Sequence, residues 1–239
     1  MNTIKVNHGE TKMVAHRGVS GLERENTCAA FVAAGSRSYF GIETDVHRTA
    51  DGNFVVIHDG NTQRVSGDNV NVEESTLETV QRIRLTDKDG TKSRYDLYVP
   101  QLHEYVSICK RYEKVGVLEL KSAFTDEEIA KMIDIIKGYD YLDGIIFISF
   151  NYDNLLKVKA ILPDQACQFL TGACDDALIE RLKADKLDLD INLKGVSEEL
   201  VKKLHENGII INVWTVDNPE DAERLVGWGV DQITSNILE

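Results

Sequence analysis

The sequence predicts an α/β protein whose strand–helix units close into a TIM (β/α)8 barrel, with a small hairpin and loop excursion after the second strand. Short apolar runs alternate with amphipathic helical patterns, as in βαβ units built around a parallel sheet. The chain has 239 residues, a length typical of one such barrel. An open doubly wound sheet is the alternative, but the first strand ends in His16-Arg17-Gly18 and lacks the glycine-rich turn typical of that fold.

The first part of the chain contains two strands, a helix and a hairpin. Lys12–His16 and Phe40–Val46 are apolar enough to be strands, and alanine-rich Asn26–Ser36 between them favours a helix. Asp51-Gly52 then predicts a hairpin turn, with Phe54–His58 as the return arm. In this antiparallel pairing we expect His58 to lie about opposite Asp45.

The excursion covers residues 47–99. Its segment Gly60–Val99 is polar and irregular, with one short helix expected around Thr76–Arg84. A connection of this length is usually a functional loop or a surface excursion. Because no boundary is visible, we predict one domain over residues 1–239.

The second half alternates regularly between strands and helices. The expected strands are Gly116–Lys121, Gly144–Phe150, Gln165–Leu170, Leu187–Asn192, Ile209–Val216 and Val230–Ser235. The expected helices are Pro100–Tyr112, Asp126–Ile136, Tyr152–Ile161, Asp175–Ala184, Ser197–Asn207 and Pro219–Gly227. With the hairpin arm set aside, these strands and the first two make eight, the number a closed barrel needs.

Composition narrows the possible partners and compartment. A net charge of −13 argues against nucleic acid or an anionic membrane as a general partner. No apolar run is long enough for a transmembrane helix, and the N-terminal residues lack the apolar region of a signal peptide. We therefore expect a cytoplasmic protein, although a processed secreted chain would look the same. The four cysteines lack metal or C-x-x-C spacing, which favours reduced thiols.

Acidic residues stand at the carboxyl ends of the predicted strands, where active sites of such barrels lie. Glu43 and Asp45 are two residues apart on one strand and so point to one face; Glu119 and Lys121 repeat this spacing on the next barrel strand. Hard carboxylate oxygens are the ligands that Mg²⁺ and Ca²⁺ prefer. The sequence thus predicts a divalent metal held by Glu43, Asp45 and Glu119.

Cations and histidines stand at the same rim. Arg17 and Lys121 are placed to neutralise a bound anion, and the guanidinium fork of Arg17 suits phosphate. His16 and His58 can share general acid and general base duty near neutral pH. A metal, two cations and an acid–base pair around a phosphate are what cleavage of a phosphodiester requires.

Each of these residues also has a purely structural interpretation. The hairpin could simply present polar side chains on an exposed face, and Glu119 with Lys121 could form a salt bridge on one strand. Trp214 could belong to the core. Singly, these interpretations suffice, but the convergence of the residues at one rim favours a functional site.

Several motifs are recognisable in order along the chain. They are V-A-H-R-G (Val14–Gly18), E-N-T (Glu25–Thr27), A-F (Ala30-Phe31), G-I-E-T-D-V (Gly41–Val46), D-G (Asp51-Gly52), V-V-I-H-D (Val55–Asp59), L-E-L-K (Leu118–Lys121), S-F (Ser149-Phe150), V-W-T-V (Val213–Val216) and G-V-D-Q-I-T-S (Gly229–Ser235). From about residue 13 to the end, the chain resembles the glycerophosphodiester phosphodiesterases, a barrel family related to the phosphatidylinositol-specific phospholipases C.

The resemblance implies hydrolysis of a glycerophosphodiester to glycerol 3-phosphate and an alcohol. It implies an acid–base pair of His16 and His58, metal ligands Glu43, Asp45 and Glu119, phosphate contacts Arg17 and Lys121, and an alcohol-side lining of Phe150 and Trp214. The family usually has proline where Arg24 stands, a difference that affects a turn more than the chemistry.

The excursion shows no apolar patch for lipid, which favours small water-soluble diesters without a stable membrane anchor. A homodimer is possible. The alternatives are a lysophospholipase D-like or cyclic-phosphate-forming enzyme on the same barrel, and a non-catalytic protein that binds phosphate esters.

Overall fold

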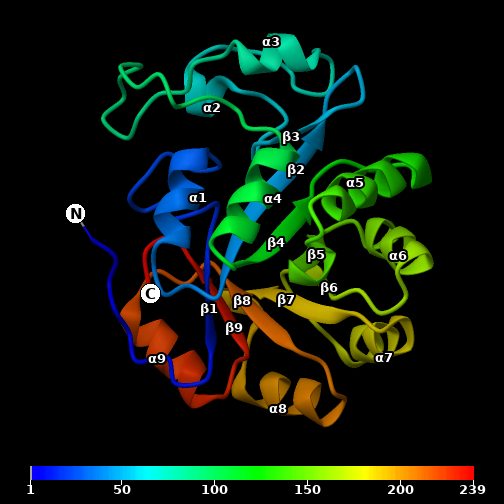
Figure 1. Cartoon of the computed structure of the whole chain (residues 1–239). Helices are drawn as coiled ribbons and strands as arrows, with labels where there is room; N and C mark the ends of the chain where they lie inside the picture. The colour runs from blue at the N-terminus through cyan, green and yellow to red at the C-terminus, as the bar shows by residue number, and fades with distance from the viewer. Residues whose placement is uncertain (1) are drawn as a thin grey trace.

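Residues 2–239 are described by a computed structural model, in which eight parallel strands close into a barrel surrounded by helices (Figure 1). The barrel strands are β1 (Lys12–Ala15), β2 (Gly41–Arg48), β4 (Val115–Leu120), β5 (Ile145–Ser149), β6 (Cys167–Thr171), β7 (Asp188–Asn192), β8 (Ile211–Trp214) and β9 (Gln232–Ser235). The first strand, β1, pairs in parallel with both β2 and β9, which closes the ring. The predicted barrel is confirmed, and the open sheet is excluded.

A helix follows each barrel strand up to β8. These helices are α1 (Cys28–Gly35), α4 (Leu102–Arg111), α5 (Asp126–Gly138), α6 (Tyr152–Ile161), α7 (Asp176–Asp185), α8 (Glu198–Glu206) and α9 (Pro219–Gly227). The first begins two residues later than the predicted Asn26, because Thr27 is its N-cap and accepts a hydrogen bond from the Ala30 N–H. Asn26 itself has φ +53°, a left-handed conformation that a helix cannot include.

The faces of the strands divide the core into two layers. Leu118 on β4 packs in the large cluster between strands and helices, whereas its neighbour Val117 belongs to a small cluster with Val14, Ile148 and Leu170. Because side chains alternate along a strand, Glu119 shares the face of Val117, which is the inner face of the barrel. The strand register places Asp45 of β2 beside Glu119.

The hairpin pairs as predicted, but with a different register at its end. Its return strand, β3 (Phe54–Val56), is antiparallel to β2, and the N–H of Ile57 donates to the carbonyl of Asp45 over 3.0 Å. Ile57, not His58, therefore stands opposite Asp45. The expectation was wrong by one residue, because the strand pairing starts from Arg48 against Phe54 and this spacing carries through the arm.

The excursion has a small core of its own and lies beyond the ends of β2 and β3 (Figure 1). It contains the expected helix in shortened form, α3 (Leu77–Gln81), and a turn of helix that the sequence did not indicate, α2 (Gln63–Ser66). Val65 of α2 is buried together with Val80 of α3. Within residues 2–239, no helix is long and apolar enough to cross a membrane.

Candidate active site

A cavity opens at the carboxyl ends of the barrel strands and collects almost all the side chains singled out in the sequence. It is lined by His16, Arg17, Glu43, His58, Glu119, Lys121, Phe150 and Trp214, together with Ile148, Leu170, Asp190, Thr215 and Thr234. Asp45 does not line the cavity, but it is in contact with Arg17 and Lys121, which do. All nine predicted residues thus gather at one place, while their individual roles stay predictions.

Three carboxylates form the acidic centre of this site. Glu43, Asp45 and Glu119 each offer an oxygen that lies within 4.8 Å of the other two. All three are buried, and Asp45 is fully shielded from solvent. Burying three like charges in one cluster is costly unless cations compensate them.

Two protein cations compensate Asp45 in particular. The Arg17 Nε lies 3.5 Å from one Asp45 oxygen, and the Lys121 Nζ lies 3.5 Å from the other and 2.9 Å from Glu119 Oε1. The side-chain amide of Asn26 also donates to Asp45 over 2.8 Å. Burial alone would raise the pKa of Asp45, but the charges of Arg17 and Lys121 lower it to about 2.

The two glutamates behave in the opposite way. Burial, followed by the negative charge of Asp45, raises the pKa of Glu119 to about 8 and that of Glu43 well above its ordinary range. The buried Oδ1 of Asp45 has no hydrogen-bond donor of its own. A cluster of three carboxyl groups, one of them with a buried oxygen that accepts no hydrogen bond, is an all-oxygen donor set that fits a hard divalent cation.

The two histidines reach the cavity with one ring nitrogen each anchored. Nδ1 of His16 lies 2.8 Å from Oδ1 of Asn236, whose amide nitrogen donates to Asp217. Because that amide oxygen can only accept, Nδ1 carries the proton and Nε2 is left free. Burial, followed by the charge of Arg17, lowers the pKa of His16 to about 4, so the ring is neutral at pH 7.

His58 is anchored in the same way by its neighbour in sequence. Its Nδ1 lies 2.6 Å from Oδ1 of Asp59, which directs Nε2 away from that carboxylate. Burial lowers the pKa of His58 as well, although the negative charge of Asp45 opposes the shift.

The loop between β1 and α1 is bent sharply to bring Arg17 into place. Arg17 has φ +53°, a conformation that costs free energy for a residue with a side chain. Its N–H donates to Glu43 over 2.8 Å, and its carbonyl accepts from the Asn26 N–H over 3.0 Å. These contacts hold the strained residue against the acidic cluster.

Two aromatic side chains form one wall of the cavity. The rings of Phe150 and Trp214 meet edge to face with their centroids 5.6 Å apart. Phe150 is half exposed, whereas Trp214 also packs against the small cluster inside the barrel. Trp214 is therefore partly a core residue that also lines the cavity, and its contact with the alcohol group stays a prediction.

Several residues at the site were not predicted. Asp190 lies in the middle of β7 and Thr234 one residue before the end of β9, and both line the cavity without a predicted role. Glu25 and Asp59 fall within recognised motifs without a role of their own. Arg64 joins these two carboxylates from the irregular excursion, and no local pattern in the sequence indicates it.

Comparison with known proteins decides the family. Residues 16–238 match the model of the glycerophosphoryl diester phosphodiesterase family. The chain belongs to this family. The predicted resemblance is confirmed, and the protein is an enzyme of the phosphoric diester hydrolase class.

Individual family members cover nearly the whole chain. A glycerophosphodiester phosphodiesterase of Caldanaerobacter subterraneus is 33% identical over 238 residues, covering 96% of both chains. An uncharacterised Bacillus subtilis protein is 31% identical over 235 residues, also covering 96% of each. The structure of an Oleispira antarctica phosphodiesterase, in complex with the product sn-glycerol-3-phosphate, matches with a TM-score of 0.88 at 26% identity. It covers 95% of this chain and 93% of that one.

Proposed function

We propose that this phosphodiesterase hydrolyses small glycerophosphodiesters to glycerol 3-phosphate and an alcohol, and that the reaction depends on Mg²⁺ or Ca²⁺. The observation that carries the proposal is the cluster of Glu43, Asp45 and Glu119 beside two histidines in one cavity. The product found in the Oleispira antarctica relative supports the choice of substrate.

The three carboxylates would hold the metal through oxygen ligands. When bound, such a cation polarises a phosphoryl oxygen and stabilises charge that develops on it. Arg17 and Lys121 already border the same cluster, at 3.5 Å from Asp45. We propose that they bind the remaining phosphate oxygens, where a fixed positive charge favours the transition state over solvent.

His16 and His58 would move the protons. As the attacking oxygen forms its bond to phosphorus, one imidazole accepts the proton through its free Nε2. The other histidine enters the step as an imidazolium with a proton on Nε2 as well, and it gives that proton to the alkoxide oxygen as the bond to the leaving alcohol breaks. The hydrogen bonds at Nδ1 support these roles, because they fix the orientation of each ring and leave its Nε2 available for proton transfer.

Phe150 and Trp214 would line the side that holds the glycerol or the alcohol group. Their apolar faces exclude water from the carbon skeleton, while the charged side of the cavity receives the phosphate. We further propose that the barrel and excursion act as one domain, because side chains of both reach this site.

The decisive experiment measures glycerol 3-phosphate released from glycerophosphocholine and glycerophosphoethanolamine, before and after treatment with a chelator. We expect release to stop with the chelator and to return with added Mg²⁺ or Ca²⁺. Turnover that is indifferent to the chelator would contradict the metal requirement. A cyclic phosphate product, or activity on lysophosphatidylcholine alone, would favour the alternative enzymes on the same barrel.

A further inference from the structure

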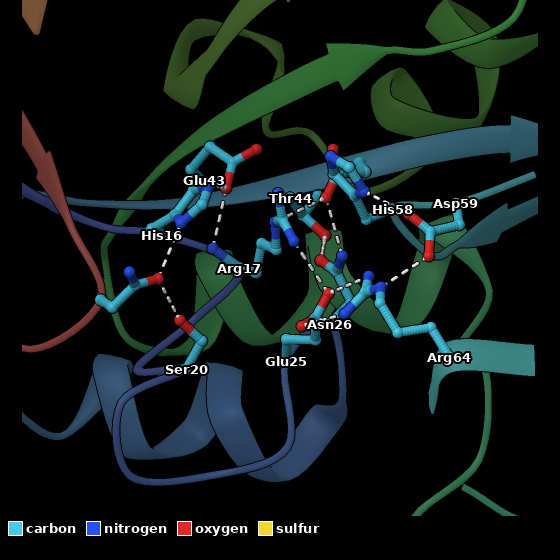
Figure 2. A network of polar contacts seen from close by, with 12 residues as sticks. His16, Arg17, Ser20, Glu25, Asn26, Glu43, Thr44, His58, Asp59 and Arg64 are labelled. Atoms are coloured by element: carbon cyan, nitrogen blue, oxygen red, sulfur yellow. Dashed lines mark hydrogen bonds and ion pairs between the residues drawn. The ribbon is translucent and has the colours of Figure 1, made fainter. Parts of the chain in front are cut away.

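One arginine of the excursion joins two acidic side chains at the edge of the cavity. Figure 2 shows the Arg64 guanidinium between Glu25 and Asp59. Its Nε donates to Asp59 Oδ2 over 2.6 Å, and its two terminal nitrogens donate to the two Glu25 oxygens over 2.8 and 2.9 Å. All three nitrogens of the guanidinium are therefore engaged.

Each of these carboxylates also holds a side chain that lines the cavity. Asp59 accepts from Nδ1 of His58 over 2.6 Å through the oxygen that Arg64 leaves free. Glu25 accepts from the terminal nitrogen of Arg17 over 3.0 Å. A continuous chain of charged hydrogen bonds thus runs from His58 through Arg64 to Arg17 (Figure 2).

The fork of an arginine is suited to this arrangement. Its donors lie in one plane at fixed angles, so contact with Arg64 determines the orientation of both carboxylates. A fixed Asp59 in turn holds the proton of His58 on Nδ1 and keeps Nε2 free. Without Arg64, the carboxylate of Asp59, about one third exposed, could rotate into water and release the ring.

Stability alone does not account for the position of Arg64. Its side chain is 45% exposed, and ion pairs at such a level of exposure contribute little to folding. The same two segments are also joined elsewhere, by Arg24 donating to the Thr86 carbonyl over 2.5 Å and by Arg94 paired with Glu23 at 2.6 Å. Neither Glu23 nor Thr86 lines the cavity.

We propose that Arg64 is a positioning residue. Through Asp59 and Glu25 it orients His58 and Arg17 so that both side chains point toward the same bound substrate. The inference rests on the proposed roles of His58 as a proton-transfer group and Arg17 as a phosphate contact. It gives helix α2 of the excursion an indirect part in the reaction, since α2 supplies the guanidinium that acts through Asp59 and Glu25.

The kinetic test compares Arg64→Met with Arg94→Met, which removes an ion pair between the same two segments. Using glycerophosphocholine, we expect Arg64→Met to lower kcat by about 10- to 100-fold, the usual effect of removing a group that orients an active residue. Arg94→Met should keep the wild-type kcat. Arg64→Lys should fall between, because an ammonium cannot engage both carboxylates in a fixed plane.

Chemical rescue separates orientation from a merely structural role. Added guanidinium ion should restore part of the kcat of Arg64→Ala, because the position is open to solvent, and should not raise the activity of Arg94→Ala. The separate variant His58→Ala should be inactive. If it is, equal kcat values for Arg64→Met and Arg94→Met would overturn the inference.

A second measurement does not depend on turnover. In ¹⁵N-histidine spectra of the metal-free protein, wild-type His58 should show the Nδ1-protonated tautomer, with His58→Ala identifying its signals. Arg64→Met and Asp59→Asn should each give a mixture of tautomers. If His58→Ala were fully active, the proposed function would fail for this residue, whereas an unchanged tautomer in Arg64→Met would refute the positioning role itself.

Discussion

The backbone N–H of Arg17 donates a 2.8 Å hydrogen bond to Oε2 of Glu43, and the same oxygen lies 3.9 Å from Nε2 of His16. Contact between the loop after β1 and strand β2 therefore fixes the positions of three residues with different proposed functions. They are a phosphate contact, a metal ligand and a proton-transfer group.

Replacement of either cavity histidine should stop the reaction while the fold persists. We expect His16→Gln and His58→Gln each to lower kcat by about 10²- to 10⁴-fold, the usual contribution of general acid–base catalysis. His8→Gln is the control, since His8 bonds the Thr11 carbonyl before β1 and does not line the cavity. Steady-state rates with unchanged circular dichroism would test this, and an active variant would remove that histidine from the acid–base role.

Asp45→Asn should weaken binding of divalent cations. The substitution removes an anionic ligand and leaves the positive charges of Arg17 and Lys121 less compensated beside the cluster, so both effects act against a cation. We expect affinity for Mg²⁺ or Ca²⁺ to fall by at least about tenfold in calorimetric titration without substrate. Glu73→Gln, which changes a carboxylate outside the cluster, should bind as the wild type does. Equal affinities would refute Asp45 as a ligand.

Phe150→Ala should affect substrate binding more than the chemical step. The ring of Phe150 supplies apolar surface to the cavity wall, so its removal should cost the substrate about 1 kcal/mol of contact, and we expect KM to rise about 2- to 10-fold with little change in kcat. Tyr95→Ala provides a matched control, because Tyr95 is an exposed aromatic residue of the excursion that does not line the cavity. A fall in kcat at constant KM would contradict a binding role.

Glu239→Gln should reduce stability in a way that depends on pH. The buried carboxylate accepts hydrogen bonds from Lys5, Ser38 and Thr3, which outweigh burial and lower its pKa from 4.5 to about 2. Since the folded pKa is lower than the unfolded one, this stabilisation is complete above about pH 4.5 and is lost as the pH falls toward 2. Urea unfolding should show a deficit of about 1–3 kcal/mol at pH 7 that shrinks below pH 4.5. A constant deficit would exclude ionisation as its cause.

Gly18→Ala should destabilise the loop that carries Arg17. Gly18 has φ +73°, and a Cβ there would lie 2.7 Å from the Ala30 backbone. The left-handed conformation and the overlap together should cost about 2–5 kcal/mol. Gly67 has φ +78° but open space around it, so Gly67→Ala isolates the conformational part at about 1–2 kcal/mol. Equal losses in urea unfolding would show that the loop yields to the extra methyl group.

The barrel and the acidic cluster could be predicted because they follow from periodicities. Alternation along β2 and β4 places Glu43, Asp45 and Glu119 on one inner face, and parallel strands bring their carboxyl ends to one rim. Strand ends were less certain: Gly144 was expected in β5, yet it closes a short 3₁₀ turn, Leu142–Gly144.

The connections between the loops could not be predicted. Arg64, Glu25 and Asp59 meet through tertiary packing of an irregular excursion, and no period in the sequence relates them. The one-residue error at His58 has a similar origin, since the dipeptide Asp51-Gly52 locates a turn without specifying which pair of residues closes it.

Closure of the ring by β1 and β9 has a consequence for synthesis of the chain. The pairing joins Lys12–Ala15 to Gln232–Ser235, so the barrel brings together segments from nearly opposite ends of the sequence. During translation, the edge of β1 that pairs with β9 stays unpaired until β9 has been synthesised. Contacts of such long range slow folding and leave strand edges exposed to aggregation meanwhile. The unfinished barrel is thus prone to aggregate through the unpaired edge of β1 until β9 has joined the sheet.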